Sequence, residues 1–265
     1  ECSAGLDFET MIFYTAGAAE LLAQELGKPG YQCQPIALGV NTDAYQPAER
    51  KLKITRGILE VLLAHRHPVG IVTKSALVER DLDLLGDMAN RNLVHVMVSV
   101  TSLDKRLARS MEPRAAAPRR RLESIRRLSA AGIPVGVLVA PVVPVLNDGE
   151  IESILTQVRG AGALSAGYVM LRLPHEVKDL FRSWLQRHVP LKADHVMKRI
   201  RDIRGGSEND SQFGRRMRGT GVYAELIQKR FEIALARLSF QGMPAFDSSC
   251  FRVPRTSAPQ LELFE

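Results

Sequence analysis

Short β-branched runs alternate with longer amphipathic stretches through the first two thirds of the sequence. Each run has about five residues, most of them apolar, which is typical of strands buried on both faces of a parallel sheet. The five runs are Pro35–Gly39, Val69–Thr73, Val94–Val98, Val135–Val139 and Gly167–Leu171. Residues 8–14 are a candidate for a further short strand at the front. The repeated strand–helix unit predicts an α/β fold with right-handed crossovers.

The stretches between and after these runs carry apolar residues at helical spacing. They predict helices over residues 18–26, 52–64, 77–89, 119–131 and 150–159 and, beyond the last run, over 176–188, 193–204 and 223–238. Asn147, followed by Glu150, resembles a capping box at a helix start. The strand–helix rhythm ends near residue 174, and the sequence from Gly242 has prolines and no period. We therefore expect a βα unit over residues 1–174, a helical extension packed on it over 175–241, and a loosely held irregular tail over 242–265.

Composition removes several classes of protein. The 265 residues are 45% hydrophobic and 25% charged, which is normal for a globular protein, and no apolar stretch is long enough to cross a membrane. No basic-then-apolar leader opens the chain, and the three cysteines lie far apart, so we expect a cytoplasmic protein without disulfides. The net charge of +7 permits an anionic partner, but it is equally compatible with a merely basic surface.

Polar residues follow four of the five runs, where the carboxyl ends of parallel strands would gather them at one mouth. They are Asn41, Thr42 and Asp43; Thr73, Lys74 and Ser75; Ser99, Thr101, Ser102 and Asp104; and Arg172, Pro174, His175 and Glu176. The fourth run leads to an apolar turn, Ala140–Val143. Ordinary turn chemistry is the alternative explanation, since Asn, Asp and Ser favour turns in any case. It does not explain Lys74, which could hold an anionic group such as a carboxylate or act as a Schiff-base nucleophile.

Two basic segments cover residues 105–127 and 198–218. They are either solvated helix faces or a track for the phosphates of a nucleic acid. Aromatic residues make up 6% of the chain, so a base-stacking platform is not supported. The histidines and cysteines form no metal-binding pattern.

Several motifs taken together resemble one family. They are Gly5-Leu-Asp-Phe-Glu-Thr10, Ala37-Leu-Gly-Val-Asn-Thr-Asp43, Val72-Thr-Lys-Ser75, Val98-Ser-Val-Thr101, Met111-Glu-Pro-Arg114 and Arg172-Leu-Pro-His-Glu-Val-Lys-Asp179. This combination is similar to the radical SAM proteins of the spore-photoproduct-lyase-like group, often labelled DNA repair photolyases. The resemblance implies a partial (βα)6 TIM-like barrel with S-adenosylmethionine across the strand ends and a [4Fe-4S] cluster at its head.

The resemblance also assigns roles to individual residues. It implies that Lys74 binds the methionyl carboxylate and that Asn41, Thr42 and Ser99 line the methionyl and ribose region. The turn around Pro141 would lie near the adenine. Asp43 and Thr101 complete the expected cofactor-binding set. A flavodoxin or ferredoxin as reductant follows from the family, and nucleic acid along the basic segments is a candidate substrate.

The sequence departs from the family at the cluster. The family's three ligands are spaced C-x-x-x-C-x-x-C, a pattern that leaves one iron open, and this sequence has no such motif. Gly5–Thr10 matches the segment that follows the cluster loop, so we expect the chain to lack the first strand and that loop. The prediction is a radical SAM protein that forms a 5′-deoxyadenosyl radical only in its full-length form. The alternative is a non-catalytic barrel that binds S-adenosylmethionine or nucleic acid.

Overall fold

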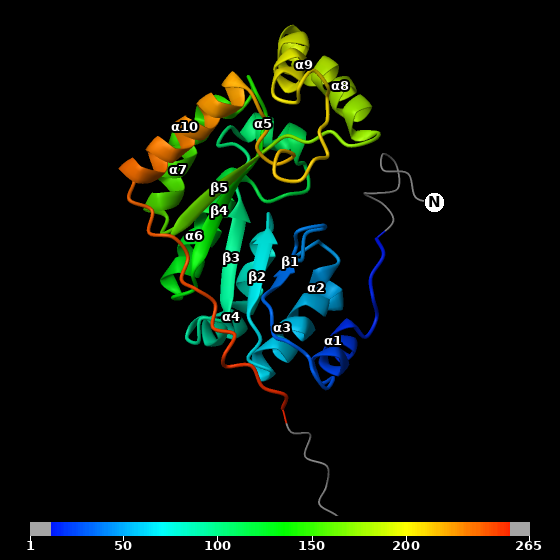
Figure 1. The fold of residues 1–265 in the computed structure, drawn as a ribbon, viewed down its shortest axis with the longest axis vertical. Coiled ribbons are helices and arrows are strands. Elements are labelled where there is room, and N and C mark those ends of the chain that lie inside the picture. The colour runs from blue at the N-terminus through cyan, green and yellow to red at the C-terminus, as the bar shows by residue number, and fades with distance from the viewer. Residues whose placement is uncertain (1–11, 255–265) are drawn as a thin grey trace, which may run out of the picture.

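A computed structural model describes residues 12–254 of the chain (Figure 1). The elements in chain order are α1 (Ala18–Leu26), β1 (Ile36–Leu38), α2 (Glu49–Leu52), α3 (Ile54–Ala64), β2 (Val69–Thr73), η1 (Ala76–Asp81), α4 (Leu82–Ala89), β3 (Val94–Ser99), α5 (Lys105–Met111), α6 (Pro118–Ala130), β4 (Val135–Val142), η2 (Asp148–Glu150), α7 (Ile151–Gly160), β5 (Ser165–Met170), α8 (Val177–His188), η3 (Pro190–Lys192), α9 (Ala193–Asp202) and α10 (Val222–Arg237). Here η marks 3₁₀ turns.

The five strands form one parallel sheet in the order β1-β2-β3-β4-β5. Each strand pairs with the next along the chain, for example Val69 of β2 opposite Val94 of β3. The sheet is open and does not close into a barrel, in agreement with the predicted partial barrel. All five predicted runs are confirmed as strands, within two residues at their amino ends.

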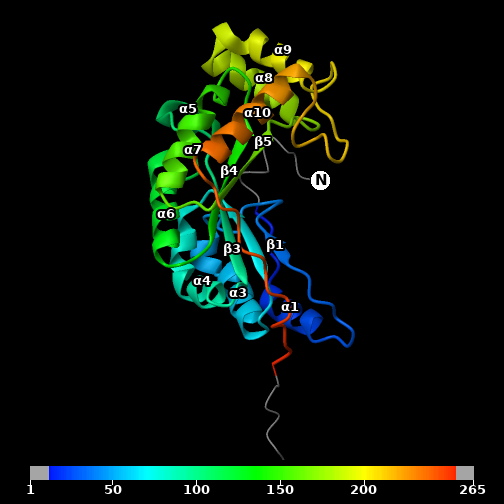
Figure 2. The same ribbon diagram turned by 60° about the vertical axis from the view of Figure 1, so that its left-hand side comes forward.

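The helices α3, α4, α6 and α7 form one layer behind the sheet, and the main core lies between them (Figures 1 and 2). Alternate residues of each strand, such as Val94, Val96 and Val98, are buried in it. The opposite face of the sheet is concave and half-exposed at Val72 and Met97. This pattern explains why the strands are apolar on both faces although only one of them is fully covered.

The three late helices divide between two cores. Helix α10 packs beside α7, and its Ile227 and Phe231 belong to the main core. Helices α8 and α9 instead build a second core over the carboxyl ends of β4 and β5, where Val143 and Leu171 meet Leu185 and other apolar side chains. The domain boundaries predicted near residues 174 and 241 remain predictions.

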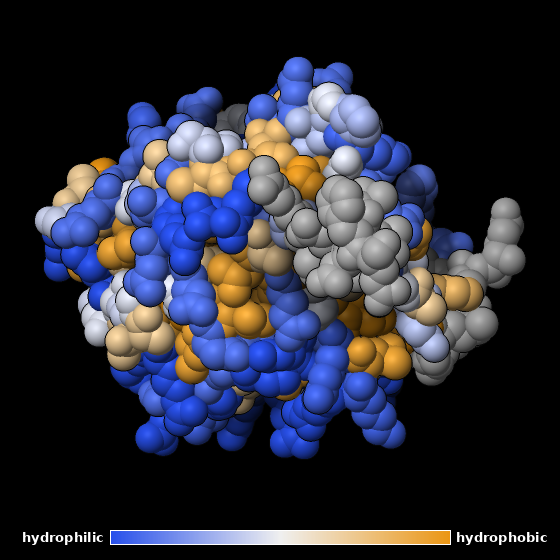
Figure 3. All heavy atoms as spheres, turned by 90° about the horizontal axis from the view of Figure 1, so that it is seen from below, coloured by the Kyte–Doolittle hydropathy of each residue, from blue (hydrophilic) through white to orange (hydrophobic). Residues whose placement is uncertain are grey.

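The tail crosses the amino ends of the strands. Gly242 N–H donates to the Leu164 carbonyl before β5, Asp247 N–H to the Asn92 carbonyl before β3, and Arg252 N–H to the His65 carbonyl before β2. Phe246 stacks on His95 with ring centroids 3.9 Å apart. The tail is irregular, but up to residue 254 it is held by these contacts and not loosely. Seen from below, this face shows apolar side chains near its middle with many hydrophilic ones around them, and further apolar patches toward its left and right margins (Figure 3).

The helix expected over 52–64 is confirmed as α3 (Ile54–Ala64), and Lys53, in a left-handed conformation (φ 51°), separates it from the short helix α2 before it. Several other local predictions were wrong. The helix expected over 77–89 begins as the 3₁₀ turn η1. The apolar turn expected after Val139 is a continuation of β4, with a register shift between Val139 and Val142. Helix α5 was not predicted. The candidate strand over 8–14 falls mainly outside the described residues, and 12–14 form no strand.

Candidate functional site

A tight turn after β1 shapes one side of the mouth at the carboxyl ends of the strands. Gly39 has φ +81°, and a Cβ there would lie 2.0 Å from the carbonyl oxygen of Val72. Only glycine fits this close approach. The chain that follows is held by Asp43, whose Oδ1 accepts from Thr73 Oγ1 at 2.7 Å and whose Oδ2 accepts from Lys74 N–H at 2.8 Å. Asp43 therefore braces β1 against β2.

Lys74 stands directly after β2, and a carboxylate fixes its side chain. Its Nζ lies 2.6 Å from Glu112 Oε1, and Glu112 Oε2 lies 2.6 Å from Arg121 Nη2. Arg121 comes from α6 and is only 3% exposed. It also donates from Nη1 to the carbonyl of Ser99 at 2.9 Å and from Nε to that of Ala116 at 2.7 Å. A chain of charges thus joins the ends of β2 and β3.

The charges of this chain do not cancel. Burial by itself raises the pKa of Glu112, but the charges of Arg121 and Lys74 outweigh burial and hold that pKa below its ordinary value. Glu112 is therefore a carboxylate at neutral pH. Because Arg121 already balances its negative charge, the ammonium of Lys74 adds one net positive charge at the mouth. The side chain of Lys74 is 37% exposed, so an incoming anion can reach it.

Three hydroxyl side chains, of Ser99, Thr101 and Ser102, lie at the end of β3 or just after it, and they differ in their hydrogen bonding. No hydrogen bond of Ser99 Oγ occurs within residues 12–254. Thr101 Oγ1, by contrast, donates to the Ala140 carbonyl at 2.9 Å, and Ser102 Oγ donates to Glu150 Oε1 at 2.7 Å. Both residues are 1% exposed. Ser99, which is 4% exposed, therefore has an unused hydroxyl among the described residues, whereas Thr101 secures β3 to β4.

The predicted capping box at Asn147 and Glu150 is wrong, because both side chains serve tertiary contacts. Asn147 is 1% exposed; its Nδ2 donates to the carbonyls of Thr101 and Pro141, and its Oδ1 accepts from Val143 N–H. The Glu150 carboxylate accepts from the loop after β3 instead. These bonds hold the carboxyl end of β4 at Pro141, which follows a cis peptide bond, against the chain just after β3.

The structure thus brings most of the predicted site residues to one end of the sheet. Lys74 and Ser99 are joined through the Glu112–Arg121 pair, and Asp43 lies beside Lys74. Asn41 and Thr42 are exposed, with no hydrogen bond to the rest of the described chain. A cavity of about 490 Å³ opens next to Lys74, between η1 and the segment before α6, with Arg50, Arg114 and Arg120 on its lining.

Glu112 and Arg121 were missing from the predicted site. The Met111-Glu-Pro-Arg114 motif had singled out Glu112, because its proline predicts a shaped loop. Arg121 carried a signal too. It stands four residues before Ile125 and seven before Leu128, on the buried face of α6.

The Schiff-base alternative for Lys74 finds little support in this geometry. A nucleophilic lysine needs a neutral amine, which apolar surroundings or a second cation favour. The carboxylate of Glu112 at 2.6 Å instead stabilises the ammonium. The arrangement is that of an ammonium held in place by a carboxylate.

The cysteines in the described part of the chain lie at the wrong end for this site. Cys33 precedes β1, and Cys250 Sγ donates to Asp247 Oδ2 in the tail at 3.0 Å. Burial raises the pKa of Cys33, and the bond to Asp247 raises that of Cys250, so both thiols stay protonated. No group of three potential metal ligands occurs within residues 12–254. These residues do not fit an iron–sulfur cluster.

Internal contacts use many cations of the two basic segments. Arg120 and Arg127 pair with Glu79, and Arg121 is buried. Arg204, 3% exposed, donates to the carbonyls of Leu171 and Arg216 and so fastens the loop beside β5. The exposed cations for which we find no acidic partner in the described region include Lys105, Arg106, Arg109 and Arg119. They lie on α5 and at the start of α6, next to the mouth.

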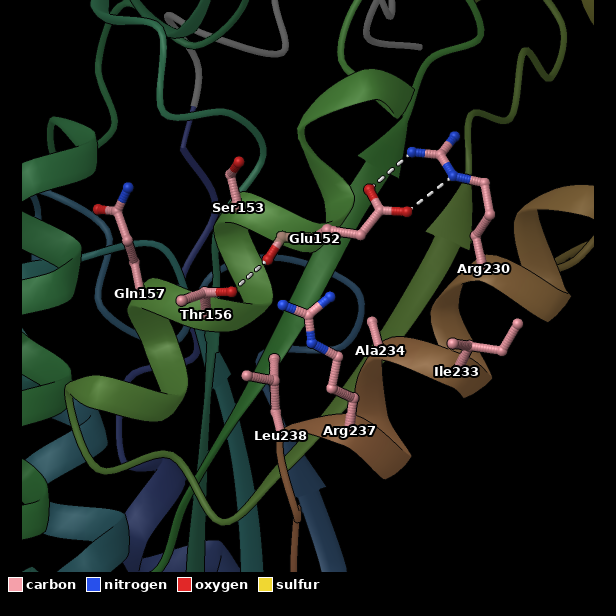
Figure 4. A pocket seen from close by; sticks show the side chains of 9 residues that line it. All are labelled: Glu152, Ser153, Thr156, Gln157, Arg230, Ile233, Ala234, Arg237 and Leu238. Atoms are coloured by element: carbon pink, nitrogen blue, oxygen red, sulfur yellow. Dashed lines mark hydrogen bonds and ion pairs between the residues drawn. The ribbon is translucent and has the colours of Figure 1, made fainter.

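A second cavity of about 500 Å³ lies between α7 and α10, on the outside of the molecule (Figure 4). Glu152 and Arg230 close one side of it with two parallel hydrogen bonds of 2.8 and 2.7 Å. Ile233 and Leu238 give it an apolar wall. None of the predicted site residues lines it. No described helix is long and apolar enough to cross a membrane.

Comparison with known proteins agrees with this architecture. Spore photoproduct lyase, solved as a point mutant, superposes with a TM-score of 0.54 at 14% identity, over 84% of this chain and 64% of the lyase. Another variant of that lyase, solved with a dinucleoside spore photoproduct, gives the same values. At this identity the likeness concerns the fold.

The chain also has relatives that are similar in sequence. The uncharacterized protein Rv2578c of Mycobacterium tuberculosis is 37% identical over 188 residues, 70% of this chain and 55% of that protein. The uncharacterized protein ORF301 of Acidianus two-tailed virus is 41% identical over 109 residues, 41% of this chain and 35% of that protein. The chain spans about half the length of Rv2578c and about a third of that of ORF301. Residues 2–158 match the profile of the Radical SAM superfamily. The chain belongs to the radical SAM superfamily.

Proposed function

We propose that this chain binds S-adenosylmethionine across the carboxyl ends of β2, β3 and β4 and forms the body of a radical SAM enzyme. The observation that supports this most directly is Lys74, a half-exposed cation fixed at a strand end and linked through Glu112 and Arg121 to the backbone of Ser99, whose hydroxyl is unused among the described residues. An ammonium suits the methionyl carboxylate. The half-buried apolar side chains of Val72, Met97 and Leu138 on the concave face suit the adenosyl part.

The proposed roles differ between the residues. Lys74 would bind the carboxylate and Ser99 would donate to, or accept from, the methionyl or ribose part. Asn41 and Thr42 would close over the ligand from the turn after β1. Asp43 and Thr101 would act by holding the strand ends together, since their polar atoms are already bonded. Pro141 would border the adenine from the carboxyl end of β4, which Asn147 holds.

Radical chemistry in this family also needs a [4Fe-4S] cluster, and a bound cluster with S-adenosylmethionine supplies a 5′-deoxyadenosyl radical. Because the described residues offer no ligands, we propose that cysteines of a full-length form, spaced C-x-x-x-C-x-x-C, hold it. A flavodoxin or ferredoxin would then be the reductant. The in-frame DNA upstream of the Glu1 codon tests this: absence of the three cysteine codons leaves a non-catalytic binding protein.

Isothermal titration calorimetry with S-adenosylmethionine tests the binding itself. We expect Lys74→Met to weaken binding by about tenfold to a hundredfold, the loss of one charge-assisted hydrogen bond. Lys51→Met, an exposed lysine of α2, is the control and should change nothing. Equal affinity of Lys74→Met and the parent chain would remove Lys74 from the site.

We also propose that nucleic acid binds beside the mouth, along Lys105, Arg106, Arg109 and Arg119. These four side chains are exposed, and none of them forms an ion pair with an acidic residue of the described region. Each phosphate contact releases counterions, so affinity should fall steeply as salt rises. Filter binding of a DNA oligonucleotide between 50 and 200 mM salt, roughly the range where such losses are large, tests this. A flat response would exclude a nucleic-acid substrate on this surface.

A further inference from the structure

We propose that Glu112 is a positioning residue that aims Lys74 at the carboxylate of the ligand, with Arg121 as its counter-charge. This inference rests on the proposed function, because it concerns how Lys74 meets S-adenosylmethionine. It adds Glu112 and Arg121 to the site: Glu112 positions Lys74, and Arg121 neutralises the charge of Glu112.

The first step of the argument is the reach of Lys74. A lysine side chain has four rotatable bonds, and ordering it costs up to about 2 kcal/mol of rotamer entropy. Lys74 is already ordered, because its Nζ contacts Glu112 Oε1 at 2.6 Å. A ligand that arrives at the mouth therefore meets a cation whose ordering has been completed during folding.

The second step is the rigidity of Glu112 itself. It follows α5 and lies just before Pro113, on a loop. Its other oxygen is held at 2.6 Å by Arg121, which is nearly fully buried and anchored to two backbone carbonyls. Through Glu112, the side chain of Lys74, which directly follows β2, is therefore positioned by α6 and the end of β3.

The third step is the balance of charge. A carboxylate beside Lys74 would by itself repel the carboxylate of the ligand and cancel the attraction. Arg121 neutralises Glu112, so the trio keeps one positive charge, and its exposed member is Lys74. Lys74 can bridge Glu112 and the ligand, since an ammonium has three donors.

Calorimetry on the whole chain with two ligands tests the proposal. S-adenosylmethionine carries the carboxylate; its decarboxylated form keeps the sulfonium and the adenosine and lacks only that group. In Glu112→Gln we expect affinity for S-adenosylmethionine to fall by about fivefold to tenfold, typical of coupling between contacting residues. Affinity for the decarboxylated ligand should not change, whereas general damage to the fold would weaken both.

A double-mutant cycle completes the test. If Glu112 acts through Lys74, Glu112→Gln should cause no further loss in a Lys74→Met background. Glu152→Gln is the matched control, because Glu152 also pairs with an arginine but lies at the distant α7–α10 cavity (Figure 4). It should leave both affinities unchanged. Should Glu112→Gln fail to fold, Glu112→Asp carries the test, because its shorter side chain cannot span Arg121 and Lys74.

The outcomes separate the two proposals. Unchanged or tighter binding of S-adenosylmethionine in Glu112→Gln, or an additive loss in the double variant, overturns the positioning role while the proposed function stands. If the parent chain binds neither ligand, or binds both equally, the proposed contact between Lys74 and the carboxylate is itself wrong.

Discussion

Arg121→Met is the perturbation whose cost the structure predicts most directly. The change keeps an unbranched side chain of similar length within the buried face of α6, but it deletes three hydrogen bonds. Two of them go to the neutral carbonyls of Ser99 and Ala116, each worth about 1 kcal/mol. The third goes to the charged Glu112 and is worth about 1.5–3 kcal/mol. The free energy of unfolding should therefore fall by about 3–5 kcal/mol, the range found when a buried ion pair loses one partner.

The assay is urea denaturation followed by far-UV circular dichroism at pH 7, with Arg230→Met as the control. Arg230 also pairs with a carboxylate, but its side chain is 28% exposed and that of Glu152 is 48% exposed. Water screens this pair, so its loss should cost only about 1 kcal/mol. If the free energy of unfolding falls by the same amount in both variants, burial does not make the Arg121–Glu112 pair more stabilising than the exposed pair, and the reasoning is refuted.

The pH dependence supplies an independent check. The folded pKa of Glu112 lies below its ordinary value of 4.5. Its contribution is therefore present above pH 4.5 and is lost as the pH falls through the lower, folded pKa. Below pH 4 the stability difference between the parent chain and Arg121→Met should narrow. A difference that stays constant down to pH 3 would show that Glu112 is not the charged partner.

Three further variants test the fold around the site. Gly39→Ala places a Cβ against the Val72 carbonyl and should cost more than about 2 kcal/mol of stability, whereas Gly30→Ala, with φ +82° and open space, should cost only about 1 kcal/mol. Asp104→Ala removes the side chain that caps α5 and should cost about 1 kcal/mol in urea denaturation. Phe246→Ala removes the aromatic contact between tail and sheet, so limited proteolysis should cut near residue 246 faster than in the parent chain.

The sheet was predictable because a strand buried on one face and half-covered on the other must be apolar throughout. The runs beginning at Val69, Val94 and Val135 carry that signal without help from the rest of the chain. The break between α2 and α3 at Lys53 has no such local signal. Lysine does not favour a left-handed backbone, so the packing of the neighbouring residues must impose this conformation. Helix α5 had a local signal, the cap formed by Asp104 with the amides of Arg106 and Leu107.

The site was predictable only in part, because residues that hold it act over long sequence separations. Lys74 stood out as a cation at a strand end. Asn147 looked like a local cap, yet its amide bonds a carbonyl 46 residues earlier in the chain. The capping rule fails here because tertiary hydrogen bonding decides the position of the side chain. Asn147 is 1% exposed, so its amide must find hydrogen-bond partners inside the protein, even far away in the sequence.

The two ends of the sheet differ in the side chains that cover them. At the amino ends the tail, the protonated thiols and Phe246 close the structure, and no charged side chain is held there for a ligand among the contacts described above. At the carboxyl ends, buried arginine and carboxylate side chains tie adjacent strands together. Such buried charges cost free energy relative to apolar packing. This cost falls at the end of the sheet that carries Lys74, whose side chain is held by Glu112 and is 37% exposed. The stability of the fold does not by itself require this rigid support of Lys74, and the support is what the proposed contact between Lys74 and an anionic ligand would need.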